Sequence, residues 1–206
     1  MWRSALSAAV VVGGMLVLAR IALAAPPLLN PSFEQANTQT DLVAWTEFGN
    51  VFQEPVTPLT GTYSVKMFGN FTTDGNLSGI FQDVAATPGE GWTAGVNVRH
   101  NTGDALTFNN RALLKLEFLN ASFTQISFVE NTILTSGSAL NTYTHHTAWA
   151  LAPVGTSWAR ISLLYVQDPF DAGGAAFFDD ASLVPEPSAM VMLGFASLLL
   201  ARRRSR

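Results

Sequence analysis

The segment from Tyr143 to Trp149 contains the residue types best suited to contact a sugar. Flat aromatic rings stack on the apolar faces of sugar rings, and imidazole or hydroxyl groups hydrogen-bond to sugar hydroxyls. The adjacent histidines, His145 and His146, would point to opposite faces of a strand, so they cannot share one metal ion. We therefore predict a carbohydrate-binding site at Tyr143, His145 and Trp149, with Arg99 adding hydrogen bonds from a neighbouring strand.

The chain lacks the residue patterns that mark common catalytic centres. It contains no cysteine, which excludes thiol catalysis, thiolate zinc sites and redox roles. Only His100 adds to the two histidines above, so a three-histidine zinc site is disfavoured. Nucleophile-elbow, zinc-protease and phosphate-loop motifs are missing, and none of the 15 acidic residues is marked as part of a glycosidase pair. We expect that the protein is not an enzyme.

Short alternating segments must position these residues. Between residues 25 and 184, no stretch of ten residues has a helical period, whereas many apolar–polar alternations are separated by Gly, Pro, Asn, Thr and Asp. The predicted strands cover residues 63–67, 78–84, 92–99, 112–118, 123–129, 143–151, 157–165 and 176–184. Eight or nine strands predict an all-β fold with two antiparallel sheets, and the turn-rich residues 131–142 are expected to form a long loop.

The other tryptophans of this domain fit core positions better than binding positions. Trp92 and Trp158 lie in alternating strands with apolar partners, which favours burial. Trp45 is expected to plug the core in the same way. An alternative without a sugar pocket predicts that Trp149 is also buried, beneath a flat polar surface rich in Thr and Asn.

The last 22 residues have the composition of a targeting signal. They combine a Pro-Glu-Pro turn, an uncharged apolar run and a basic end: Pro185, Glu186 and Pro187, residues 189–201, and Arg202, Arg203 and Arg204. The run has no polar face, which disfavours an amphipathic helix packed on the domain. It is short for a bilayer, but snorkelling arginines can hold its end in the cytoplasm. We expect a short hydrophobic helix that is held in the inner membrane at least transiently.

This order of elements, over residues 184–206, resembles the PEP-CTERM sorting signal of Gram-negative bacteria. The resemblance implies that an exosortase, an integral membrane protease-transpeptidase, recognises Pro185, Glu186 and Pro187 and removes the tail. It links the chain to exopolysaccharide production and to biofilm or floc formation, with a final location at the cell surface or in the extracellular matrix. It says nothing about the preceding domain.

The first 24 residues match a secretory signal peptide. Arg3 supplies the positive start, residues 5–18 form the apolar region, and Ala22 to Ala24 form the cleavage site. We expect a signal helix that is removed before Ala25. An uncleaved N-terminal anchor is the alternative, and either one exports the domain.

The remaining domain is strongly acidic once both ends are set aside. Five basic residues stand against 15 acidic residues in residues 25–186, a net charge of about −10. Such a domain repels phosphate backbones, so nucleic-acid binding is disfavoured. The charge is compatible with divalent cations and with uncharged polysaccharide.

A second resemblance rests on short motifs whose order spans nearly the whole domain. They are Asn30-Pro31-Ser32-Phe33-Glu34, Trp45, Gly61-Thr62-Tyr63-Ser64, Phe81-Gln82-Asp83-Val84, Pro88-Gly89, Trp158-Ala159-Arg160-Ile161 and Phe178-Asp179-Asp180-Ala181. This layout is similar to galactose-binding-like jelly rolls, in particular carbohydrate-binding modules of the family 4/9/22 type. It implies a jelly-roll β-sandwich and polysaccharide binding. The loops that carry sugar contacts in that family have no residue-by-residue match here.

The same resemblance implies a structural calcium ion between the first and last motifs. Glu34 and Asp179 are the matching carboxylates, and backbone oxygens near Gly61 would add to them. Calcium takes six to eight oxygen ligands, and it would tie the chain ends together without a catalytic role. The alternative is that Glu34 caps a turn and that Asp179 or Asp180 accepts backbone hydrogen bonds.

Together these features predict three segments: a signal peptide at 1–24, a β-sandwich domain at 25–184 and a sorting and anchor segment at 185–206. We expect an exported, non-catalytic cell-surface or matrix protein that binds polysaccharide. A purely structural or adhesive matrix component is the alternative, and a glycoside-active hydrolase is less favoured.

Overall fold

In the computed structural model, residues 28–168 and 173–186 are described. They form β1 (Ala36–Thr38), β2 (Asp41–Leu42), β3 (Thr46–Phe48), β4 (Asn50–Glu54), β5 (Ser64–Phe68), β6 (Asn76–Ala85), β7 (Gly91–Arg99), η1 (Thr102–Asp104), β8 (Arg111–Leu119), β9 (Gln125–Thr135), β10 (Thr144–Leu151), β11 (Trp158–Gln167) and β12 (Ala175–Pro185). Within these ranges, no helix has the length and apolar character to cross a membrane. The predicted signal helix and the sorting tail from Pro187 onward, with Arg202, Arg203 and Arg204, lie outside the described residues.

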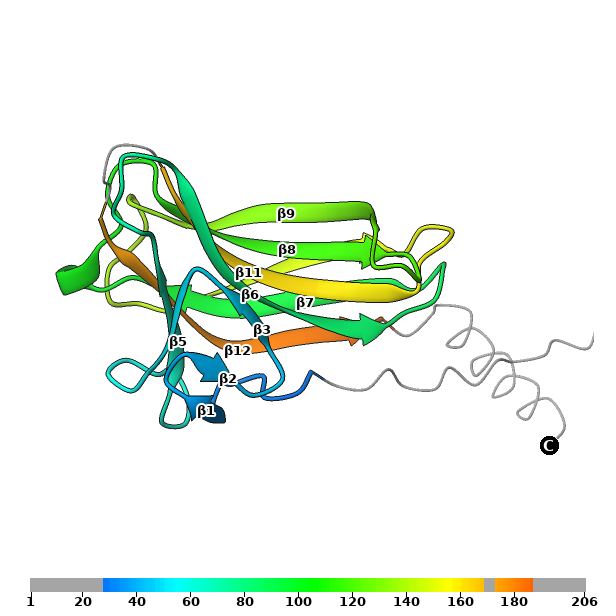
Figure 1. Cartoon of the computed structure of the whole chain (residues 1–206), viewed down its shortest axis with the longest axis horizontal. Helices are drawn as coiled ribbons and strands as arrows, with labels where there is room; N and C mark the ends of the chain where they lie inside the picture. Colours follow the sequence, from blue (N-terminus) through cyan, green and yellow to red (C-terminus); the bar gives the residue numbers. More distant parts are fainter. Residues whose placement is uncertain (1–27, 169–172, 187–206) are drawn as a thin grey trace, which may run out of the picture.

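The strands form two five-stranded antiparallel sheets and a small ribbon, β1–β2 (Figure 1). One sheet, called the β7 sheet here, has the order β10-β7-β12-β5-β4. The other, the β11 sheet, has the order β3-β6-β11-β8-β9. Most neighbouring strands within each sheet come from distant parts of the sequence, as in a jelly roll, whereas β4–β5 and β8–β9 are consecutive pairs. The predicted all-β jelly-roll sandwich is therefore confirmed.

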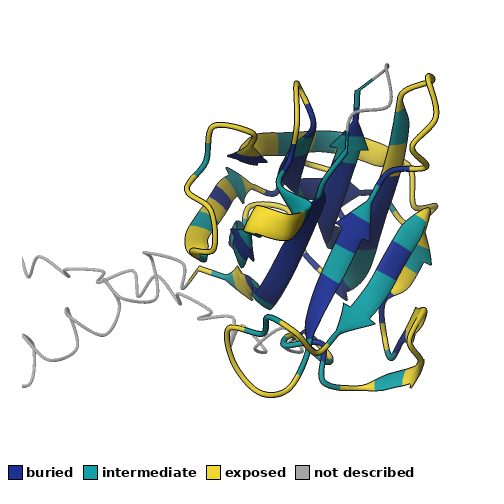
Figure 2. Cartoon of the chain, turned by 90° about the vertical axis from the view of Figure 1, so that its left-hand side faces the viewer, coloured by how far each residue is buried: buried dark blue, intermediate teal, exposed yellow. Residues whose placement is uncertain are grey.

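The core lies between the two sheets, where the alternating pattern directs the apolar side chains (Figure 2). In β7, Trp92, Val96 and Val98 are fully buried, and in β11, Ile161 and Leu163 face them from the other sheet. Burial of one such side chain contributes roughly 1.5–3 kcal/mol. The chain has no cysteine, so no disulfide adds to this core in holding the two sheets together.

Two core predictions for tryptophan are confirmed and one is wrong. Trp92 and Trp45 are buried, and the Trp45 indole nitrogen donates to the Asn30 carbonyl at 3.0 Å. Trp158 begins β11 on the outer side of its sheet and is only partly buried. Its ring stacks on Phe123 with the centroids 5.1 Å apart, so apolar neighbours in sequence did not indicate which face it occupies.

The long loop predicted for residues 131–142 is wrong, because β9 continues to Thr135. It pairs with β8 along its length, from Leu119↔Gln125 to Arg111↔Thr135. β9 is an edge strand with mostly exposed residues, so its sequence is polar enough to look like a loop. The short polar strands β1 to β4 were missed for the same reason.

Candidate functional site

Trp149 lies on the outer surface of the β7 sheet and is 57% exposed. It pairs with Thr93 in β7, while the preceding residue, Ala148, points into the core. His145 is also exposed and lies on the same surface, opposite Asn97. Of the predicted carbohydrate contacts, Trp149 and His145 therefore share one face.

Small residues flatten the surface around Trp149. A Cβ atom at Gly91 would lie 3.3 Å from the indole nitrogen of Trp149, and one at Gly95 would lie 3.3 Å from Cε1 of His145. Gly95 also pairs with Ser182 of β12. We call this surface the Trp149 face: Gly91, Thr93, Gly95, His145, Trp149 and Ser182. Both aromatic rings rest beside backbone that carries no side chain.

Arg99 and Tyr143 belong to a different cluster. The Arg99 guanidinium lies 5.3 Å from the centre of the Tyr143 ring, and the Tyr143 hydroxyl donates to the Thr57 carbonyl at 2.7 Å. Burial raises the pKa of Tyr143 to about 12, so the hydroxyl stays protonated. Arg99 lies six positions beyond Thr93 in β7, which is about 20 Å along a strand. The structure therefore does not bring Arg99 and Tyr143 to Trp149.

The other histidines face away from this surface. His100 is fully buried, its Nδ1 accepts from the Leu106 amide at 3.1 Å, and its Nε2 lies 3.0 Å from the Ser138 carbonyl. Burial lowers the pKa of His146, and its Nε2 lies 2.8 Å from the Thr144 hydroxyl. His145 and His146 point to opposite sides of β10, as the strand period requires.

The predicted calcium residues gather around the loop between β4 and β5. Asp179 is fully buried, and its Oδ2 accepts from the amides of Leu59 and Thr60 at 2.7 and 3.1 Å. Its Oδ1 accepts from the Asp180 amide at 2.8 Å. These bonds hold residues 59 and 60 beside Asp179, which pairs with Asn97 opposite His145, so the loop lies at the Asn97 end of the Trp149 face.

Glu34 binds the same loop a few residues further along the chain. Its carboxylate accepts from the amides of Thr62 and Tyr63 at 3.0 to 3.1 Å. Gly61 lies between these anchors with φ of +62°, and a Cβ there would lie 2.3 Å from Glu34 Oε1. Only glycine fits this approach. The carboxylates thus bind backbone amides, as the alternative to calcium predicted.

No cationic side chain neutralises the two carboxylates of this cluster in the described residues. Burial raises the pKa of Asp179 above its ordinary value, so the ionised form is disfavoured by desolvation. None of the three ion pairs among the described residues includes Glu34 or Asp179. The same residues contain no group of three or more acidic or histidine side chains that could hold a metal. Any calcium site here would need backbone carbonyl oxygens beside the two carboxylates.

A second surface, on the outer side of the β11 sheet, was not singled out in the sequence. Register places Asp83, Arg160, Glu117 and Phe128 in one row across β6, β11, β8 and β9. The next row holds Phe81, Ser162 and Lys115. We call these seven residues the polar lane.

Hydrogen bonds interlock the polar lane. Arg160 donates to both carboxylate oxygens of Asp83 at 2.6 and 2.8 Å, which raises the pKa of Arg160. Ser162 donates to Glu117 at 2.9 Å, and Lys115 lies 2.8 Å from the same carboxylate. Although this is the outer side of a sheet, Glu117 is only 7% exposed.

Aromatic rings border these charges. The Arg160 guanidinium lies 3.9 Å from the centre of the Phe81 ring, and the Lys115 ammonium lies 4.5 Å from that of Phe128. Phe128 is 51% exposed at the sheet edge. The lane thus offers fixed donors and acceptors beside ring faces, which is the chemistry that polyhydroxylated ligands require.

The sequence did carry a signal for this lane. Alternate residues of the apolar strands β6, β8 and β11 are polar or charged, which marks the outer faces. The pattern could not show that these residues fall in register across four strands, because register depends on the topology.

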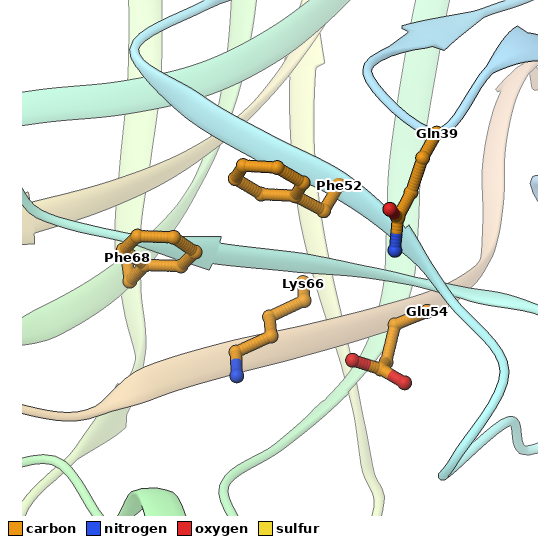
Figure 3. Close-up of a pocket in the computed structure, with 5 residues that line it drawn as sticks. All are labelled: Gln39, Phe52, Glu54, Lys66 and Phe68. Carbon is orange, nitrogen blue, oxygen red and sulfur yellow. The ribbon is translucent and has the colours of Figure 1, made fainter.

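A third feature is an open hollow near the β4 edge of the β7 sheet, lined by Gln39, Phe52, Glu54, Lys66 and Phe68 (Figure 3). The rings of Phe52 and Phe68 stack with centroids 5.4 Å apart. Lys66 lies between these rings and Glu54, and its ammonium is paired with Asp104. Its charged group is therefore already engaged.

The predicted sorting motif begins where β12 ends. Pro185 is the last residue of β12, and the Glu186 amide donates to the Gly91 carbonyl at 2.7 Å. Thr93 donates to the Glu186 carboxylate at 2.6 Å. Pro185 and Glu186 are thus attached to the domain beside the Trp149 face, and Pro187 lies outside the described residues.

The fold and its surfaces define an antiparallel jelly-roll β-sandwich. No protein-family model matches the chain, and the search of curated proteins found no match. A cyclase from Fischerella sp. TAU, solved with 4-(1H-indol-3-yl)butan-2-one, has a similar structure, with a TM-score of 0.58 and 15% identity over 79% of this chain and 98% of the cyclase. At such identities the likeness defines the fold alone.

Carbohydrate-binding modules are also among the similar structures. A family 61 module in complex with β-1,4-galactotriose has a TM-score of 0.54 and 16% identity, over 78% of this chain and 99% of the module. The enzymatically active domain of tailspike protein 4 from bacteriophage CBA120 has a TM-score of 0.54 and 14% identity over 76% of this chain. The chain spans only 22% of that tailspike structure, so the likeness concerns one part of it.

Proposed function

We propose that this chain is an exported, non-catalytic cell-surface or matrix protein that binds polysaccharide through the polar lane. The observation that carries the proposal is the row of ion-paired, largely covered side chains on an outer sheet surface, bordered by Phe81 and Phe128. Such groups are held rigidly before a ligand arrives, which lowers the cost of binding. The carbohydrate-binding modules among the similar folds support the same ligand class.

The two alternatives are less well supported. A matrix component without a sugar pocket predicted a buried Trp149, whereas Trp149 is 57% exposed. A hydrolase needs a carboxylic acid and a carboxylate that face a substrate. In the lane, Asp83 is engaged by Arg160, and Glu117 is engaged by Lys115 and Ser162. This pairing suits binding better than proton transfer.

Affinity gel electrophoresis of the full-length chain tests the proposal. Three gels contain β-1,4-galactan, xylan or hydroxyethylcellulose, and at least one of them should retard the wild-type chain. Phe128→Ala should weaken that retardation about tenfold, as expected when an aromatic contact of more than 1 kcal/mol is removed. Phe108, which is 78% exposed in a loop before β8, gives the control Phe108→Ala with unchanged retardation. If none of these polysaccharides slows the migration of the wild-type chain, the proposal is refuted.

Export and sorting form the second part of the proposal, and the sequence of both chain ends supports it. A signal peptide at residues 1–24 and an exosortase acting at Pro185, Glu186 and Pro187 would deliver the domain to the cell surface. Mass spectrometry of the protein recovered from a host with an exosortase should find an N-terminus at Ala25 and loss of the tail. An intact chain at both ends would argue against this route.

We include a structural calcium ion at Glu34, Asp179 and the backbone near Gly61 in the proposal. Support comes from the carboxylate of Asp179, which is buried, accepts only backbone amides in the described residues and would be stabilised in its ionised form by a cation. Calcium should raise the Tm of the full-length chain, and EDTA should reverse the effect. Glu34→Ala and Asp179→Ala should each abolish the shift. An unchanged Tm in the wild-type chain would exclude the ion.

A further inference from the structure

Trp149 supplies an aromatic surface that the polar lane does not use. The indole is 57% exposed, yet it does not project freely, because its nitrogen and Cζ2 lie 3.3 and 3.5 Å from the Cβ position of Gly91. The backbone of β7 therefore supports the ring from one side. A supported, exposed ring is a stacking platform that loses little conformational entropy on binding.

The surroundings favour an uncharged, hydroxyl-rich occupant. Thr93 and Ser182 carry hydroxyls, and His145 adds an exposed imidazole next to Gly95. The Glu186 carboxylate, held by Thr93, would repel anionic ligands such as acidic lipid headgroups. A membrane-inserting aromatic would be expected to project, whereas this ring is supported beside the sheet.

The two surfaces lie on opposite sides of the sandwich. β7 and β10 belong to one sheet, and β8 and β11 belong to the other, with their apolar sides facing each other across the core. Stacked sheets lie about 10 Å apart, and their outer surfaces point in opposite directions. A single extended polysaccharide segment therefore cannot contact both surfaces at once.

We propose that the Trp149 face is a second saccharide-binding surface and that the domain bridges two polysaccharide chains. The bridging rests on the proposed function of the polar lane, whereas the contact at Trp149 stands on its own geometry. The loop anchored by Asp179 lies at the Asn97 end of the face. The four steps along β7 from Thr93 to Asn97 leave about 13 Å for the bound segment. The second surface would hold a short stretch of sugar residues.

Light scattering from the full-length chain mixed with a soluble polysaccharide that retards it provides the test. Wild-type protein should cross-link the polysaccharide, and scattering should peak at an intermediate protein ratio and fall in excess protein. Trp149→Ala should keep gel retardation through the lane but lose at least tenfold in scattering. The control Phe108→Ala should scatter like the wild type.

A second readout isolates the Trp149 face. In a chain that carries Phe128→Ala, the polysaccharide should still protect Trp149 fluorescence from acrylamide quenching, and Trp149→Phe should remove the protected signal. Cross-linking that survives Trp149→Ala would overturn the inference. So would protection of Trp149 by phospholipid vesicles but not by polysaccharide. A wild-type chain that binds no polysaccharide at all would refute the proposed function as well.

Discussion

The polar lane and the Trp149 face occupy equivalent positions on the outer sides of two sheets, but they are built in opposite ways. In the lane, Arg160, Asp83 and Glu117 fill the surface with paired charges. In the Trp149 face, Gly91 and Gly95 have no side chains, so the Trp149 ring lies beside uncovered backbone. We therefore expect substitutions in the lane to reduce stability, whereas the Trp149 face can change at little cost to folding.

The loop anchor at the border of the Trp149 face should produce the largest effect on stability. Asp179→Ala removes the shared acceptor of three backbone amides in partly buried hydrogen bonds, which should lower the free energy of unfolding by about 3 kcal/mol. Urea denaturation measures this loss. Asp179→Asn keeps one acceptor oxygen and should lose less, and equal losses in both variants would contradict the role given to these bonds.

Loss of the Arg160–Asp83 ion pair in the polar lane should have the second-largest effect on stability. Arg160→Leu leaves the carboxylate of Asp83 partly buried without its bidentate partner and should cost about 2 kcal/mol. Arg160→Lys keeps the charge and should cost about half as much. Denaturation curves with unchanged midpoints would show that the ion pairs do not support the sheet.

The pH dependence of the free energy of unfolding should reflect the raised pKa of Asp179. Its pKa is raised in the folded chain, so the folded state binds the proton more tightly than the unfolded state does. Without calcium, its contribution to stability should be largest below its ordinary pKa and should fall as pH rises through the raised value. In EDTA, the free energy of unfolding of the wild type minus that of Asp179→Asn should decrease as the pH is raised from 3 to 7. A difference that grows with pH would contradict the assignment.

The smallest effect is expected at Trp149 itself. Trp149→Ala removes an exposed ring that rests on Gly91, so the free energy of unfolding should change by less than about 0.5 kcal/mol. The same substitution is expected to abolish cross-linking. A loss of stability comparable to that of Arg160→Leu would mean that Trp149 is a structural residue.

Local patterns predicted the fold well, because alternation in β7, β8 and β11 determines which residues enter the core. They failed where strands are polar edges, as in β9 beyond residue 130, since edge residues need no apolar partner. They also failed for Trp158, whose neighbours are apolar although its ring lies outside the core.

The candidate site was only partly predictable. Trp149 and His145 share a face because period 2 places them together, whereas Arg99 and Tyr143 are separated from Trp149 by the length of β7. Glu34 and Asp179 both bind the loop that contains Gly61, and these contacts are hydrogen bonds from the backbone amides of the loop. The lane depends on register across four strands, which no local pattern contains.

Titration of the ¹⁵N-labelled full-length chain with an oligosaccharide from the polysaccharide that retards it tests the central claim most directly. Saccharide binding in the polar lane should shift the Arg160 Nε–H signal and the backbone amides of Lys115 and Glu117, and Phe128→Ala should require about tenfold more ligand for the same shift. If the oligosaccharide leaves these signals unchanged, or shifts only those of β7 and β10, the polar lane is not the principal binding surface.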